Sequence, residues 1–229
     1  MKTIGIIGGL SWVSTVDYYR IINEEVNKHL GGVDAAKIIL YSLNYGDIVR
    51  LTRQDDWKTI AEMFCDAARK LEQAGADCLL LGANTAHRVA DEVRTVINIP
   101  LIHISEATAN AIAAKKLHVV ALLGTRFTME MDFYHDILRR HGIETIIPGD
   151  ADRDFIHATI YDELGKGLLL PETKQRYLHI IEQLIEKGAQ GIILGCTEIP
   201  LLIKPEDVTV PVFDTAEIHA KAAVAFALG

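Results

Sequence analysis

Short apolar runs alternate with longer amphipathic stretches along the whole chain. The runs are rich in Ile, Leu and Val without strict polar alternation, which is typical of strands buried on both faces of a parallel sheet. The expected strands are Thr3–Ile7, Lys37–Leu43, Cys78–Leu81, Ile99–Ile104, Val119–Leu123, Glu144–Ile147, Ile192–Leu194 and Val210–Phe213. The expected helices are Val13–Leu30, Trp57–Gln73, Ala107–Lys115, Thr128–Arg140, Glu172–Glu186 and a last helix over 215–229. This alternation predicts βαβ units and open, mainly parallel sheets in an α/β fold.

The same pattern occurs twice in the chain. The matching segments are Thr3–Gly8 with Val119–Gly124, Gly75–Gly82 with Gly188–Gly195, and Ile99–His103 with Val210–Asp214. They lie 116, 113 and 111 positions apart and keep the same order, which indicates an internal duplication. We therefore expect two pseudo-symmetric lobes, each an open sheet flanked by helices, over residues 1–112 and 113–229. The last helix, 215–229, is a candidate to pack on the first lobe. Parallel sheets bind ligands outside the carboxyl ends of their strands, so we expect the active site in the cleft between the lobes.

Composition excludes several functional classes. The formal net charge is −8 over 229 residues, and no basic stripe is present, which argues against binding nucleic acid or an anionic membrane. No apolar run approaches the roughly 18–20 residues that a membrane span needs. We expect the segment Met1–Ile7 to be a strand rather than a secretion signal. The three cysteines are widely spaced, without a C-x-x-C pair, so we expect no disulfide framework, no metal site and a reducing cytoplasm.

Four motifs follow apolar strands and precede expected helices, namely Gly8–Ser11, Gly82–Thr85, Gly124–Thr128 and Gly195–Glu198. Such turns present backbone N–H groups beside a helix N-terminus, which favours a bound carboxylate. The short side chains that add hydrogen-bond donors are Ser11, Asn84, Thr85, Thr125 and Thr197. The turns therefore fit a small acidic ligand. The alternative is that each of these side chains caps a helix.

Cys196 is the strongest candidate for catalysis. It follows a strand and precedes a helix, so we expect the helix dipole to lower the pKa of its thiol and favour the thiolate. A thiolate can act as a base toward a Cα–H or as a nucleophile. The alternative is a buried apolar cysteine, which is the role we expect for Cys65 and Cys78.

Other residues give weaker signals. Arg50, which follows the second strand, could bind a distal carboxylate, and Lys166 lies on a Gly-flanked loop that could cover the cleft. The alternative for Arg50 is a solvated charge at the start of a helix. We expect the histidines, among them His87, His103 and His219, to lie at the surface or to support other residues, since none shows metal-binding spacing. The glycines near the N-terminus do not form G-x-G-x-x-G, and no acidic residue ends the second strand, so a dinucleotide site is disfavoured.

Six motifs are spread over essentially the whole length of the chain, namely Ile4–Thr15, Ala83–His87, Leu122–Met129, Ile160–Leu164, Gly195–Ile199 and Phe213–Ala220. Together they resemble the motifs of the aspartate/glutamate racemases. The resemblance implies an isomerase that needs no pyridoxal phosphate or other cofactor, is often dimeric and has two pseudo-symmetric lobes. It also implies a small acidic amino acid as substrate.

Racemases of this family typically place one cysteine on each side of the substrate Cα. Cys196 matches one of them, whereas the other position is Ala83, which lies 113 positions earlier. Alanine carries no exchangeable proton, so ordinary two-thiol racemisation is in doubt. Three explanations stay open: an inactivated variant, an enzyme that uses one thiol, or related chemistry such as decarboxylation of malonate-type acids by a single thiol. A non-catalytic binding protein for small carboxylates is a further alternative.

Overall fold

A computed structural model describes residues 1–229 and divides the chain into two units. The first unit is Met1–Ile104 with His219–Gly229, and the second is Ser105–Ile218. We had expected the boundary near residue 112. The division instead runs through two helices, α5 (Ile104–Ala114) and α11 (Thr215–Leu228), and most of α11 belongs to the first unit.

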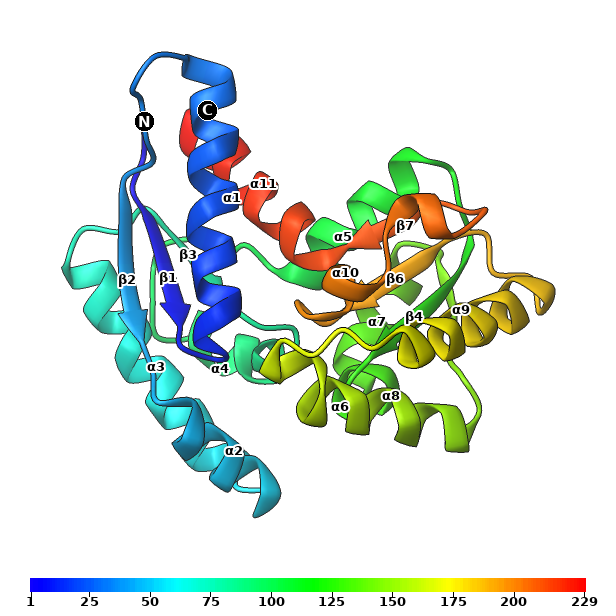
Figure 1. The fold of residues 1–229 in the computed structure, drawn as a ribbon. Helices are drawn as coiled ribbons and strands as arrows, with labels where there is room; N and C mark the ends of the chain where they lie inside the picture. Colours follow the sequence, from blue (N-terminus) through cyan, green and yellow to red (C-terminus); the bar gives the residue numbers. More distant parts are fainter. The chain divides into compact units, whose positions relative to one another are not determined.

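The first unit is built on a three-stranded parallel sheet with the order β2-β1-β3 (Figure 1). The strands are β1 (Ile4–Gly8), β2 (Ile38–Ser42) and β3 (Cys78–Leu81). The helices are α1 (Trp12–Leu30), α2 (Tyr45–Arg53), α3 (Trp57–Gln73), the 3-10 helix η1 (Thr85–Val89) and α4 (Ala90–Arg94). The core forms because β1 and β3 are buried along their whole length and α3 packs Ile60, Phe64 and Leu71 against the sheet. Burial of this apolar surface is the main force that holds the unit together.

The second unit is built on a four-stranded parallel sheet with the order β5-β4-β6-β7. The strands are β4 (Val119–Gly124), β5 (Glu144–Ile146), β6 (Ile192–Gly195) and β7 (Val212–Asp214). The other elements are α6 (Arg126–Glu130), α7 (Asp132–Arg140), α8 (Asp150–Asp162), η2 (Leu164–Lys166), α9 (Pro171–Glu186), α10 (Ile199–Leu202) and η3 (Pro205–Asp207). α8 and α9 bury Ile156, Tyr177 and Ile181 in a separate core. The predicted α/β class with parallel sheets is confirmed.

Strand register repeats between the units as the duplication requires. Ile7 pairs with Leu81 in the first unit, and Leu123 pairs with Leu194 in the second. Leu123 lies 116 positions after Ile7, and Leu194 lies 113 positions after Leu81. These are the spacings found between the matching sequence segments. The turns after β3 and β6 therefore occupy equivalent places in their own sheets.

Two expected elements differ in the structure. The segment Ile99–Ile104 forms only a one-residue bridge between Leu79 and Leu101, because Pro100 has no N–H and α5 begins at Ile104. The expected helix Thr128–Arg140 is split at Met131, whose backbone is extended. The His135 Nε2–H donates to the Met129 carbonyl at 2.7 Å, so that this carbonyl is engaged outside the helical pattern.

No helix in the structure combines the length and the apolar character that a membrane crossing requires. No group of three or more His, Cys, Asp or Glu side chains is arranged to hold a metal ion.

Candidate active site

The carboxyl ends of β4 and β6 bring Thr125 and Cys196 to one edge of the second sheet. Gly124 and Gly195 are register partners, and each is followed directly by one of these residues. A Cβ on Gly124 would lie 2.9 Å from the Gly195 carbonyl oxygen, so the two strand ends approach too closely for any larger residue. The glycines therefore allow the side chains of Thr125 and Cys196 to lie at the ends of neighbouring strands.

The Cys196 thiol has a carboxylate partner. It donates a hydrogen bond to Glu198 Oε2 at 2.8 Å, and the Thr197 hydroxyl donates to the same oxygen at 2.8 Å. Glu198 is buried, whereas Cys196 and Thr197 are partly exposed. Two short donors on one carboxylate oxygen hold Glu198 beside the thiol, and a carboxylate in that place can accept the thiol proton.

Our expectation of a lowered thiol pKa is wrong. Burial raises the pKa of Cys196 well above its usual value, and the negative charge and hydrogen bond of Glu198 raise it further. The following helix, α10, has four residues, too few for a substantial dipole. The resting thiol is therefore protonated. The other two thiols fit their expected structural roles, since burial raises the pKa of Cys78 to about 12 and Cys65 is partly buried on α3.

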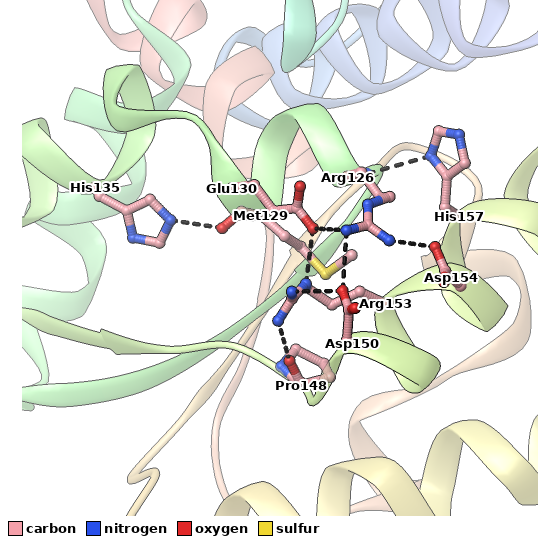
Figure 2. Close-up of polar contacts among 9 residues, drawn as sticks. All are labelled: Arg126, Met129, Glu130, His135, Pro148, Asp150, Arg153, Asp154 and His157. Carbon is pink, nitrogen blue, oxygen red and sulfur yellow. Dashed lines mark hydrogen bonds and ion pairs between the residues drawn. The ribbon is translucent and has the colours of Figure 1, made fainter.

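A network of ion pairs supports the turn that carries Thr125 (Figure 2). Arg126 pairs with Glu130 at 2.8 Å, with Asp150 at 3.0 Å and with Asp154. Arg153 joins Glu130 at 2.7 Å and Asp150 at 2.8 Å, so two guanidinium groups share carboxylates from α6 and α8. The backbone N–H of Arg126 also donates to His157 Nδ1 at 3.2 Å. The network joins α6 to α8 directly after β4.

In the first unit, the turns after β1 and β3 carry Ser11, Ala83, Asn84 and Thr85. Asn84 is buried, and Ala83 and Thr85 are partly exposed. Neither Ser11 nor Asn84 caps the helix that follows it, whereas Thr125 does accept a hydrogen bond from Thr128 N–H as the cap of α6. Capping therefore accounts for Thr125 but not for Ser11 or Asn84.

Ser11 has an unusual backbone. Its φ angle is 98°, a left-handed value that an L-residue other than glycine rarely adopts. Its carbonyl accepts hydrogen bonds from the side chains of Ser14 at 2.9 Å and Thr15 at 3.1 Å, which help to hold this conformation. Backbone strain of this kind gathers at functional sites.

Arg50 and Lys166 are both exposed. Arg50, on α2, pairs with Asp47 at 2.8 Å. Lys166, at the end of η2, lies 3.6 Å from Asp162. Both cations thus have a carboxylate nearby, and their assignment as carboxylate-binding residues stays a prediction.

Three histidines expected to lie at the surface or to support other residues form a buried cluster in the first unit. The ring of His87 lies 4.5 Å from that of His103 and 5.3 Å from that of His219, between ring centroids. His219 Nε2–H donates to the Ile102 carbonyl at 2.7 Å, so its Nδ1 accepts from the Tyr18 hydroxyl at 2.8 Å. Burial lowers the pKa of His103 to about 3 and that of His219 to about 4. The rings of His103 and His219 are therefore neutral near pH 7.

Comparison with known proteins identifies the family. Residues 7–223 match the family model described as Asp/Glu/hydantoin racemase. The chain is 46% identical to a putative Asp/Glu racemase from Yersinia pestis over the whole of both chains, with a TM-score of 0.95. It is 36% identical to an aspartate racemase homologue from Pyrococcus horikoshii, again over both whole chains, with a TM-score of 0.87. It is also 27% identical to a broad specificity amino-acid racemase of Bacillus subtilis, over 96% of each chain.

Proposed function

Because the chain belongs to the Asp/Glu/hydantoin racemase family, we propose that it exchanges the Cα proton of a small acidic amino acid without a cofactor, through the Cys196 thiol. The observation that carries this proposal is the hydrogen bond from Cys196 Sγ to Glu198 Oε2. The relatives are named as racemases that act on amino acids, which supports the substrate class.

The proposed step starts from the protonated thiol. Glu198 takes the thiol proton, and the resulting thiolate takes the Cα proton and leaves an enediolate on the substrate. A thiolate is a far weaker base than the carbanion, so fixed hydrogen-bond donors have to stabilise the developing charge. Asn84, Thr85 and Thr197 are the proposed donors to the α-carboxylate. Ser11, Arg50, Thr125 and Lys166 are the remaining proposed contacts.

Ala83 sets the expected stereochemistry. Its methyl group occupies the place in the first unit that Cys196 occupies in the second, and it cannot deliver a proton. We therefore propose that the chain as given removes and returns the proton on only one face of the substrate Cα. Exchange at Cα then proceeds mainly with retention of configuration, and inversion is slow.

The test follows solvent deuterium into the Cα position of L- and D-aspartate and L- and D-glutamate. We expect one enantiomer to exchange faster than it racemises, Cys196→Ser to abolish exchange, and Cys65→Ser to leave it unchanged as a matched control. Ala83→Cys is expected to raise the rate of inversion relative to exchange. The proposal is wrong if no amino acid exchanges, or if exchange survives Cys196→Ser.

A second candidate is favoured by the raised pKa of Cys196. A thiol that keeps its proton suits a reaction that quenches a carbanion, as in decarboxylation of a malonate-type acid. Release of CO₂ from a substituted malonate, lost in Cys196→Ser, would favour it. Binding of aspartate without exchange or CO₂ release would instead favour a carboxylate-binding protein.

We also propose that the chain forms a homodimer through α1. Trp12, Val16 and Tyr19 are 74%, 56% and 58% exposed and are spaced so that they share one face of the helix. Exposed apolar residues grouped in this way mark interaction surfaces. A second copy is the partner that the family resemblance favours.

A further inference from the structure

His87 links the turn after β3 to the start of α5. The residue is 2% exposed, and its ring lies between two backbone groups. Nδ1 lies 3.0 Å from the carbonyl oxygen of Ala83, and Nε2 accepts a hydrogen bond from the N–H of Ile104 at 3.2 Å. The backbone N–H of His87 closes the same turn, since it donates to the Asn84 carbonyl at 3.1 Å.

These contacts fix the tautomer. A backbone N–H can only donate, so Nε2 carries a lone pair, and the single proton of the neutral ring is on Nδ1. Nδ1–H therefore donates to Ala83. The neutral state is maintained because burial, together with the nearby His103 and His219, lowers the pKa of His87 well below its usual value.

The bond to Ala83 orients a peptide group at the proposed site. A trans peptide is planar, with its C=O and N–H pointing in opposite directions. A carbonyl of residue 83 held toward His87 therefore directs the N–H of Asn84 the opposite way. The same bond limits rotation about the backbone of Ala83 and so the direction of its side chain.

We propose that His87 is a positioning residue for the proposed reaction: its Nδ1–H holds the peptide group between residues 83 and 84 so that the turn can bind the substrate carboxylate. The inference rests on the proposed function, because the turn is a proposed carboxylate-binding element. In this proposal, the hydrogen bond with Ile104 stabilises the fold, whereas the hydrogen bond with Ala83 orients the turn that binds the ligand.

Two matched variants separate these contacts. In His87→Asn, the side-chain N–H₂ replaces Nδ1–H and keeps the bond to Ala83, while the Ile104 N–H loses its acceptor. In His87→Gln, the side-chain oxygen replaces Nε2 and keeps the bond to Ile104, while the Ala83 carbonyl is released. Each variant loses one buried hydrogen bond, so both are expected to lose similar thermal stability.

The readout is the dissociation constant for L-aspartate and L-glutamate, measured by calorimetry. We expect His87→Asn to bind within about threefold of wild type and His87→Gln to bind at least tenfold more weakly, a difference of about 1.4 kcal/mol. Equal affinities, or weaker binding in His87→Asn, overturn the inference and leave the proposed function intact. Absence of binding by the wild type overturns both.

Wild-type protein gives a second test should the variants fail to fold. A ligand that accepts the Asn84 N–H polarises the peptide and makes the Ala83 carbonyl a better acceptor. The Nδ1–H proton of His87 should then move downfield in the NMR spectrum on addition of L-aspartate. The Nε2–H proton of His219, bound to Ile102, is the internal control. A His87 proton that stays fixed at saturating ligand contradicts the inference.

Discussion

At the scale of single residues, the pairing of Cys196 with Glu198 is the feature with the most direct chemical consequence. The carboxylate raises the pKa of the thiol by its charge and by accepting its hydrogen bond. Glu198→Gln removes the charge and should therefore lower the thiol pKa, although burial still acts on it. At a fixed pH below the pKa, each unit of decrease gives about tenfold more thiolate. The rate of alkylation by iodoacetamide as a function of pH should shift to lower pH.

Cys196→Ser provides the background from Cys65 and Cys78 for this measurement. An alkylation profile that moves to higher pH in Glu198→Gln contradicts the assignment of Glu198 as the thiol's partner. Glu198→Gln should also slow Cα exchange, because an amide cannot take the thiol proton.

The sequence predicted the place of Cys196 in the fold but not the protonation state of its thiol. Strand patterning placed Cys196 directly after a buried strand and a glycine, as the structure shows. The role of Glu198 was missed because a residue two positions after a cysteine can point in any direction until the turn is known. The predicted effect of the helix dipole was wrong because α10 has only four residues and because burial and Glu198 raise the thiol pKa, and neither can be read from the local sequence.

At the scale of elements, the ion-pair network holds α6 on α8. Arg153→Gln removes the guanidinium that joins Glu130 to Asp150, and its side chain is only 19% exposed. Hydrogen bonds to charged groups contribute roughly 1.5–3 kcal/mol, but Asp150 is 73% exposed and solvent screens its pairing. We therefore expect a loss of about 1–2 kcal/mol in unfolding free energy. The loss should shrink at high salt. Denaturant unfolding at low and high ionic strength measures both effects.

Arg139→Gln is the matched control. Arg139 also pairs with an aspartate three positions earlier, Asp136, at 2.7 Å, but its side chain is 72% exposed. A pair so open to solvent contributes little, at most about 0.5 kcal/mol. If the two variants lose the same unfolding free energy, the network contributes no more stability than a single exposed ion pair within a helix.

The histidine cluster makes a second element-scale prediction, for acid stability. His103 and His219 have folded pKa values of about 3 and about 4, against about 6.5 in an unfolded chain. Below pH 6.5 the unfolded state binds protons that the folded state does not bind. The unfolding free energy therefore decreases as the pH is lowered, until the histidines of the folded state are also protonated. By this linkage each of the two rings costs roughly 2 kcal/mol at pH 5.

The measurement is the unfolding free energy between pH 7 and pH 4.5. His103→Gln should reduce the slope below pH 6 by about 1.4 kcal/mol per pH unit, the value for one proton. A slope that is the same in wild type and His103→Gln would mean that His103 carries a proton in the folded state.

Sequence patterning predicted most strands and the longer helices because burial on two faces leaves a clear apolar signal. It failed where tertiary contacts decide. The break at Met131 is accompanied by a hydrogen bond from His135 to the Met129 carbonyl. The cluster of His87, His103 and His219 brings together segments more than a hundred residues apart. Neither contact has a local signature.

At the scale of the whole molecule, the duplication gives both units the same sheet framework, although the turns at equivalent strand ends carry different side chains. The backbone register of β1 with β3 recurs in β4 with β6, so both units keep the same framework. The turns have diverged. The turn after β6 carries Cys196 hydrogen-bonded to Glu198, and the turn after β3 carries Ala83, whose carbonyl is hydrogen-bonded to the buried His87. The three pairs of matching sequence segments were enough to predict the shared framework, whereas the different side-chain contacts of the two turns could be seen only in the structure.

The proposed homodimer is tested by a charge on the exposed face of α1. Val16→Glu introduces a carboxylate into the proposed interface, and twofold symmetry places it there twice. Burial of an unpaired charge costs at least several kcal/mol, and about 3 kcal/mol already weakens a dimer more than a hundredfold. Val33→Glu makes the same change at a residue that is 100% exposed and lies outside the face of α1 formed by Trp12, Val16 and Tyr19. In sedimentation at micromolar concentration, wild type and Val33→Glu should be dimers and Val16→Glu a monomer. A wild-type monomer, or a Val16→Glu dimer, would exclude this face of α1 as the contact between copies.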